Sequence, residues 1–265
     1  MLQLLKIEWL KLKNYRTFWI LSGLYIFSIL GLNLIVFRIQ QTIYEAKEGQ
    51  GMAEMILGRT PYSFPITWQM TAYVSSFLLF IPGLLLVICL TNEYSFRTHR
   101  QNIIDGWNRR EYISVKIALA FILSAVSTVF VTITAAIFGF ASGSSLSFDS
   151  FQYIPYYFLQ ACSYTMVALL IAVIVKRGGL AIGIYFLYSL IIENVIRVFL
   201  NFRGDNLGQF LPLQSSDELI PLPILQNVQK RVFEPANPTV MLVLVLVYLS
   251  AYVYFSIRKF ETDDL

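Results

Sequence analysis

Long runs of uncharged, mostly apolar residues alternate with short polar segments along the whole chain. A helix needs about 20 apolar residues to cross the hydrocarbon core of a bilayer. Runs of this kind predict an all-α, polytopic membrane protein with six transmembrane helices. No polar stretch is long enough to fold alone, so residues 1–265 form a single transmembrane domain. We place the spans near residues 17–37, 66–91, 114–141, 151–175, 179–200 and 239–257.

The fifth span is the shortest, because only 15 uncharged residues separate Arg177 from Glu193. Such a helix is roughly 22 Å long, which is less than the hydrocarbon core requires. The helix must therefore continue through Glu193 and Arg197, which lie four positions apart in the favourable order for an ion pair. We favour an ion pair at the outer interface, with its charges in the headgroup region. A polar element that faces the bundle interior is the alternative.

Two segments outside the spans also have recognisable patterns. Residues 2–14 combine leucine, isoleucine and tryptophan with Lys6, Lys11 and Lys13, which predicts an amphipathic interfacial helix that leads into span one. Residues 201–238 are rich in proline, yet parts of this segment are too apolar for a solvated loop. These parts either lie on or dip into the outer leaflet, or they only cover the ends of the spans.

Composition agrees with a membrane environment. The chain is 57% apolar and only 14% charged, with a mean hydropathy of +0.63, whereas soluble domains carry about 25% charged residues. Cys89 and Cys162 both lie inside apolar runs, which argues against a disulfide framework. The net charge of +4 is less informative than its distribution, and we expect no nucleic-acid partner.

The distribution of lysine and arginine predicts the orientation of the chain, because cytoplasmic loops carry an excess of both. With six spans, 13 of these residues fall on one side and 7 on the other. The first side is therefore predicted to be cytoplasmic, with both termini on it, in a multi-pass protein of the cell (inner) membrane. Its 13 residues are Lys6, Lys11, Lys13, Arg16, Arg97, Arg100, Arg109, Arg110, Lys116, Lys176, Arg177, Arg258 and Lys259.

The cytoplasmic connection between spans two and three is longer than a turn requires. Residues 94–108 have amphipathic character, with Phe96, Ile103 and Trp107 on one helical side, and Gly106 as a helix end or bend. A short helix parallel to the membrane is expected here. It either docks on a cytoplasmic protein or binds anionic lipid headgroups, and the residue pattern alone does not favour one of these.

This connection resembles the coupling region of permease subunits of bacterial ABC transporters of the type-2 exporter family. The resemblance rests on Glu93 at the end of span two, a short helix over residues 97–106, the pair Arg109-Arg110, and Lys116 at the start of span three. It extends to the N-terminal amphipathic helix, the six spans, the outer apolar stretch at residues 210–214 and the charged tail at residues 258–265. It therefore covers nearly the full chain.

The resemblance implies that the chain is one half of an export pathway. It would pair with a second copy or with a sister permease, and two ATPase subunits would bind beneath. The chain contains no G-x-x-x-x-G-K-[ST] motif, so ATP hydrolysis is expected on a separate chain, and no cofactor is expected here. The residues implied to contact the ATPase are Glu93, Phe96, Arg97, His99, Arg100, Ile103, Ile104 and Trp107.

Other functional classes find less support in the sequence. An enzyme or a metal site would need a group of ligands or catalytic side chains, and the chain has one histidine, His99, and one carboxylate within a span, Glu193. A secondary transporter would place ionisable or broken-helix elements near the midplane, whereas the other spans have uncharged centres. A non-transporting scaffold or assembly factor remains a further alternative.

Overall fold

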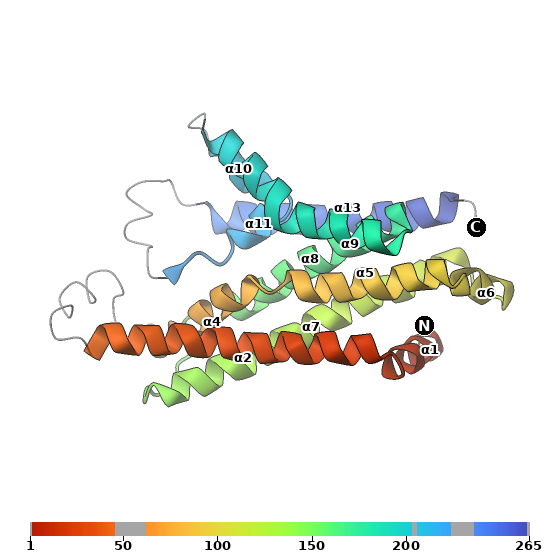
Figure 1. Cartoon of the computed structure of the whole chain (residues 1–265). Coiled ribbons are helices and arrows are strands. Elements are labelled where there is room, and N and C mark those ends of the chain that lie inside the picture. Colours follow the sequence, from red (N-terminus) through yellow and green to blue (C-terminus); the bar gives the residue numbers. More distant parts are fainter. Residues whose placement is uncertain (1, 46–61, 203–205, 224–235, 264–265) are drawn as a thin grey trace.

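The computed structural model describes residues 2–45, 62–202, 206–223 and 236–263. Every regular element in these ranges is a helix, and the long helices run side by side as one bundle (Figure 1). The prediction of an all-α, polytopic membrane protein is confirmed. The helices are α1 (Leu2–Lys13), α2 (Arg16–Glu45), α4 (Thr67–Ser76), α5 (Phe80–Ser95), α6 (Thr98–Ile104), α7 (Arg109–Ala141), α8 (Tyr153–Val175), α9 (Gly178–Leu187), the π-helix η1 (Tyr188–Ile192), α10 (Glu193–Asn201), the 3₁₀-helix η2 (Leu207–Phe210), α11 (Gln214–Asp217) and α13 (Pro238–Thr262).

Within the described ranges, five continuous helical stretches are long and apolar enough to cross a membrane, and a sixth candidate is the bent pair α4 and α5. The five are α2, α7, α8, α13, and the stretch formed by α9, η1 and α10, which runs through Glu193 and Arg197 to Asn201. Helices α2, α7 and α13 extend beyond the predicted ranges into flanking polar residues, whereas α8 begins two residues later than predicted. The predicted interfacial helix corresponds to α1, which is separated from α2 by a short turn.

The second span is broken between α4 and α5, whose axes differ by 44°. Pro82 has no N–H group to donate to the carbonyl of Leu78, so the α-helical pattern cannot continue through this point. The backbone closes the break with shorter bonds, including Leu79 N to Ser76 O and Ile81 N to Leu78 O, both 3.0 Å. The break therefore lies one turn before Pro82.

Helix α8 forms the centre of the bundle and contacts α4, α5, α7, α9 and α13. Two thirds of its apolar stretch is buried within the molecule, compared with about a fifth for α2. Glycine permits one close contact in this core: a Cβ added to Gly83 of α5 would lie 2.0 Å from the hydroxyl oxygen of Tyr185 in α9. Small side chains at such positions let membrane helices approach closely.

The segment after α10 returns into the bundle rather than staying on its surface. Leu213, Ser215 and Ile220 are buried, and α11 packs against α8, α10 and α13. The apolar part of this segment before residue 224 therefore packs among the helices of the bundle, an arrangement that neither predicted interpretation of residues 201–238 described. Residues 203–205 and 224–235 lie outside the described ranges.

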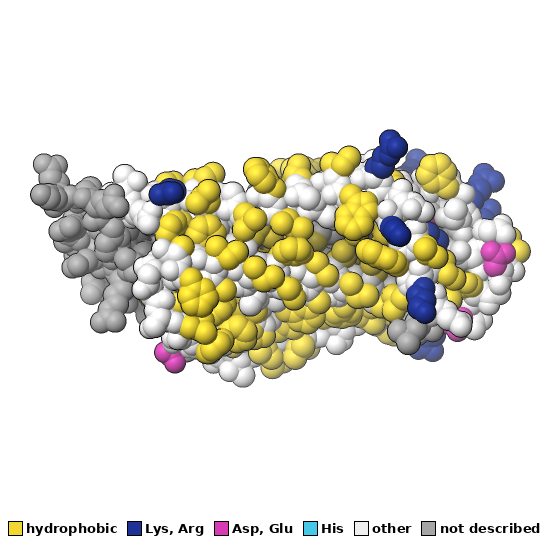
Figure 2. Space-filling view, turned by 90° about the horizontal axis from the view of Figure 1, so that it is seen from below, with side chains coloured by type: hydrophobic (Ala, Val, Ile, Leu, Met, Phe, Trp, Pro, Cys, Tyr) yellow, Lys and Arg dark blue, Asp and Glu magenta, His cyan; other side chains and the backbone are white. Residues whose placement is uncertain are grey.

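The two ends of the bundle differ in composition. We call them the α6 end, which also carries α1 and the C-terminal end of α13, and the α11 end (Figure 1). On the face drawn in Figure 2, hydrophobic side chains cover the middle of the molecule and most of the lysine and arginine side chains gather at the α6 end. This distribution is typical of a membrane protein whose two ends face different aqueous compartments.

Candidate functional site at the α6 end

The connection between α5 and α7 is a short helix held between two turns. Arg97 adopts a left-handed conformation with φ of 56°, which ends α5 and redirects the chain into α6. Gly106 has φ of 103°, a value that glycine adopts without the steric cost that other residues meet. The backbone N–H of Asn108 then donates to the side chain of Glu111 at 3.2 Å, which satisfies a free donor at the start of α7.

The eight residues predicted to contact an ATPase divide into two groups in the structure. Phe96 and Ile104 are each 77% exposed, which is unusual for large apolar side chains outside a lipid-facing surface. Arg97 and Arg100 are exposed beside them. The other four, Glu93, His99, Ile103 and Trp107, turn partly or fully inward. We call the four exposed residues, Phe96, Arg97, Arg100 and Ile104, the α6 surface. The four inward residues attach this surface to the bundle.

His99 attaches α6 to the end of α5. Its side chain is buried, its ring lies 4.7 Å from the ring of Tyr94, and Nδ1 is 3.0 Å from the backbone oxygen of Glu93. Burial lowers the pKa of His99, which favours the neutral form of the ring. These contacts indicate a structural role for His99, whereas the family resemblance implied a contact with the ATPase subunit.

Glu93 belongs to a buried group of charges that joins three helices. Nζ of Lys116 in α7 lies 2.5 Å from Oε2 of Glu8 in α1 and 2.5 Å from Oε1 of Glu93 in α5. The hydroxyl of Tyr112 donates to Oε2 of Glu93 at 2.5 Å, and Nζ of Lys11 contacts both carboxylates at 2.9 and 3.4 Å. Two acids and two lysines balance in charge. We call these five residues the α1–α5–α7 charge cluster.

Trp107 and Ile103 hold the connection between α5 and α7 against the bundle. Nζ of Lys11 lies 5.9 Å from the centre of the Trp107 ring, a distance at which a cation is attracted to an aromatic face. Ile103 packs against the main hydrophobic core. Sequence reasoning missed Glu8, although an acidic residue within the largely apolar helix α1 is the signal that points to an ionic partner.

The end of α13 is fixed to the same part of the molecule. The guanidinium of Arg109 donates to the backbone oxygens of Glu261 and Asp263 at 2.8 Å each. The carboxylate of Asp263 pairs with Lys176 at 2.7 Å and with Lys259 at 2.6 Å. The α6 surface therefore lies on a group of four helices, α1, α5, α7 and α13, that are joined by ion pairs and hydrogen bonds.

At the opposite end, Glu193 and Arg197 have partners other than each other. Oε1 of Glu193 accepts the backbone N–H groups of Leu213 and Gln214 at 2.5 and 3.0 Å. Arg197 pairs with Glu218 at 2.6 Å and donates to the Gln214 side chain at 2.7 Å. The predicted Glu193–Arg197 pair is therefore corrected, because the inserted segment brings a competing carboxylate and two free backbone donors within reach.

Among the described residues, no group of histidine, cysteine, aspartate and glutamate side chains has the arrangement that a metal ion requires. The comparison with curated proteins finds no match for the chain. Residues 4–199, about three quarters of the chain, match the family described as ABC-2 family transporter protein. This range includes most of α1, the α6 surface and the whole charge cluster. The chain belongs to the ABC-2 transporter family and is a membrane-spanning permease of that family.

Proposed function

We propose that this chain is the permease subunit of an ATP-driven exporter, coupled to separate ATPase subunits through residues 94–108. In this proposal it forms the translocation pathway as a dimer, with a second copy of itself or with a sister permease. Membership of the ABC-2 family supports the transport role. The absence of a nucleotide-binding motif from the sequence supports an ATPase on another chain.

The coupling proposal rests on the exposed α6 surface, which is held on helices joined by ion pairs and hydrogen bonds. Phe96 and Ile104 expose most of their apolar area, and a protein partner that covers them would gain the free energy of burying it. Arg97 and Arg100 beside them suit an acidic rim on the partner. Since α6 packs against both α5 and α7, movement of α6 would be passed to two spans at once.

The proposed orientation places the α6 end in the cytoplasm of a cell, where ATP is available. Lysine and arginine gather at this end (Figure 2), which is the distribution expected of a cytoplasmic face. Both chain termini would then be cytoplasmic. Of the 7 basic residues assigned to the outer side, Lys47, Arg59, Arg203, Lys230 and Arg231 fall outside the described residues.

Co-purification from the native cells tests the proposal. We expect the tagged chain, extracted in mild detergent, to retain an ATP-binding cassette subunit identified by its phosphate-binding motif. Ile104→Glu should reduce the amount of this subunit at least about tenfold, because a charge would enter an apolar contact. Leu146→Glu is the matched control, since Leu146 is an exposed apolar residue at the α11 end and should have no effect.

Two outcomes would contradict the proposal. Wild-type chain that never retains an ATPase, under conditions that preserve its helical content, would favour a secondary transporter or a membrane scaffold. Equal retention by the Ile104→Glu and Leu146→Glu variants would mean that the ATPase binds elsewhere. Size determination of the purified complex, with and without a second tagged copy, tests the dimer separately.

A further inference from the structure

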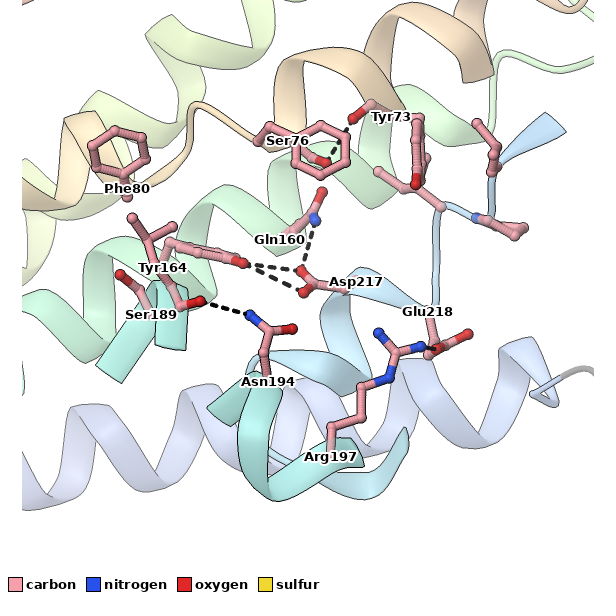
Figure 3. Close-up of a pocket in the computed structure, with 15 residues that line it drawn as sticks. Tyr73, Ser76, Phe80, Gln160, Tyr164, Ser189, Asn194, Arg197, Asp217 and Glu218 are labelled. Atoms are coloured by element: carbon pink, nitrogen blue, oxygen red, sulfur yellow. Dashed lines mark hydrogen bonds and ion pairs between the residues drawn. The ribbon is translucent and has the colours of Figure 1, made fainter. Parts of the chain in front are cut away.

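A cavity of about 240 Å³ lies near the α11 end, between two irregular points of the membrane helices. Ser76, Phe77 and Phe80 border it at the break between α4 and α5, and Ser189 and Leu190 border it from the π-helix η1. π-helical turns and broken membrane helices occur frequently at functional sites. Figure 3 shows that Asp217 lies near the middle of this region, with Gln160 and Tyr164 pointing toward it from α8.

The polar wall of the cavity offers the carboxylate of Asp217 and one further acceptor that lacks a donor. Nε2 of Gln160 donates to Oδ1 of Asp217 at 2.8 Å, while Tyr164 makes only long contacts of 3.3 and 3.4 Å with the two carboxylate oxygens. Gln160 is buried, with 2% of its surface exposed, and its Oε1 has no hydrogen-bond partner within the described ranges. In Figure 3 this oxygen lies on the side of Ser76, away from Asp217. An unpaired buried acceptor is costly.

The charge of the lining favours a cation. The guanidinium of Arg197 is already paired with Glu218 and bonded to Gln214. Asp217 therefore adds a carboxylate whose charge no described cation pairs directly. Tyr73, Phe77 and Phe80 supply aromatic surface on the other wall, and aromatic faces attract organic cations. An anionic group such as a phosphate would meet the repulsion of Asp217 and would offer no donor to Gln160.

We propose that this cavity binds the primary ammonium group of an amphipathic amine, which donates hydrogen bonds to Asp217 and to Oε1 of Gln160. A primary ammonium has three N–H donors and no acceptor, which complements these two groups. The apolar part of the ligand would lie along Phe77, Phe80 and Leu190, which border the cavity. A free alkylamine and an aminophospholipid headgroup both present this group. This binding site is independent of the proposed export function, because all residues that line the cavity belong to this chain and binding needs no ATPase subunit.

The titration of Asp217 gives the expected pH dependence. Burial raises the pKa of Asp217 to about 7, and the hydrogen bonds from Gln160 and Tyr164 only partly oppose this shift. An ammonium group binds the ionised form, so its affinity should rise as the pH increases through about 7. The titratable and charged groups that face Asp217 from the surrounding elements are Tyr73, Tyr164, Glu193, Arg197 and Glu218.

Dansylcadaverine, a fluorescent primary amine, tests the site on the full chain in phosphatidylcholine nanodiscs. We expect Asp217→Asn to weaken binding by about tenfold or more, since a charge-assisted hydrogen bond is lost. Asp149→Asn is the matched control, because it removes an exposed carboxylate in the connection between α7 and α8 and should change affinity less than about twofold. Equal binding by the wild type and Asp217→Asn would overturn the proposal.

Competition identifies the recognised group. Dodecylamine should displace the probe at a concentration at least about tenfold lower than dodecyltrimethylammonium, which carries the charge but has no N–H donor, and dodecanol should not displace it. Displacement by dodecyltrimethylammonium at the same concentration as dodecylamine, or displacement by dodecanol, would overturn the proposal. If Asp217→Asn fails to fold, two measurements on the wild-type chain still test the proposal: the order in which the competitors displace the probe, and the rise in probe affinity as the pH increases through about 7. Weaker probe binding in phosphatidylethanolamine nanodiscs would assign the site to a lipid headgroup, and unchanged binding to a free amine.

Discussion

At the scale of single residues, Lys116 joins α7 to both α1 and α5 through buried ion pairs. It is 2% exposed and bonds at 2.5 Å to Glu8 of α1 and to Glu93 of α5. Burying these charges costs desolvation free energy, which their mutual attraction offsets only while all partners remain. Loss of Lys116 would leave two buried carboxylates with only Lys11, which is partly exposed, to balance them.

We therefore expect Lys116→Met to lower the free energy of unfolding by about 3–5 kcal/mol, the range found when one partner of a buried ion pair is removed. Denaturant unfolding of the detergent-purified chain measures this. Lys6→Met is the control, because Lys6 is an exposed lysine of α1 and should change stability by less than about 0.5 kcal/mol. Glu93→Gln, added to Lys116→Met, should restore part of the lost unfolding free energy, because one of the unpaired buried carboxylates is removed. A double variant that is less stable than Lys116→Met alone would contradict this account.

Gly83 permits a second prediction at this scale. A Cβ at this position would lie 2.0 Å from the hydroxyl oxygen of Tyr185 and 2.5 Å from the adjacent ring carbon, within a fully buried contact between α5 and α9. Gly83→Ala should lower the unfolding free energy by about 1–3 kcal/mol, the usual cost of overpacking. Tyr185→Leu should relieve the clash, so the effect of Gly83→Ala should shrink in that background. Gly23→Ala, in open space, is the control.

At the scale of helices, the positions of the spans follow from the sequence, whereas one of their two irregular points does not. The apolar runs predict α2, α7, α8 and α13 because lipid requires continuous apolar length. The break in span two has a local cause, because Pro82 lacks an N–H donor. The π-helix within the fifth span has no such signal in the sequence, since packing against neighbouring helices decides where a strained turn is tolerated. The insertion of α11 follows from contacts with α8, α10 and α13, which local patterning cannot predict.

Site residues show the same division. The amphipathic pattern places Phe96 on the same helical side as Ile103 and Trp107, whereas in the structure Phe96 is exposed and the other two pack against the core. The partners of Glu193 and Arg197 could not be found from a local pattern. They come from residues 213–218, about 20 positions later in the chain. An i, i+4 rule considers only one helix, and it fails when a returning segment supplies stronger partners.

The end of α13 carries a prediction about pH. Burial would raise the pKa of Asp263, but the hydrogen bonds from Lys176 and Lys259 outweigh it and lower this pKa. A lowered pKa means that the stabilisation is present above the unfolded value of about 3.9 and is lost as the pH falls through the folded value. Asp263→Asn should therefore reduce the melting temperature at pH 5–8 and have less effect below about pH 4. A difference that grows on acidification would contradict this assignment.

At the scale of the whole molecule, α5 connects the two sites that we describe. Its last turn carries Glu93 of the charge cluster, and its first residue, Phe80, borders the cavity beside the break. A displacement of α6 that tilts α5 would therefore move one wall of the cavity relative to α8. The bend of 44° between α4 and α5 provides a place where this movement can be absorbed.

The orientation of the whole bundle is the last prediction. If the α6 end faces the cytoplasm, Gln101→Cys should react with a membrane-impermeant maleimide only after the cells are permeabilised. Ser145→Cys, in the connection between α7 and α8 near the α11 end, should react in intact cells. Both side chains are exposed, so a difference in labelling reports sidedness rather than burial.

The parent chain provides the background for this experiment, because Cys162 is buried and Cys89 lies within α5. The two variants carry the same chemical group and differ only in the end of the bundle that presents it. Labelling of Gln101→Cys in intact cells, with Ser145→Cys protected, would show that the bundle has the opposite orientation in the membrane. The α6 surface would then face away from ATP, and coupling through it would be ruled out regardless of how tightly a partner binds.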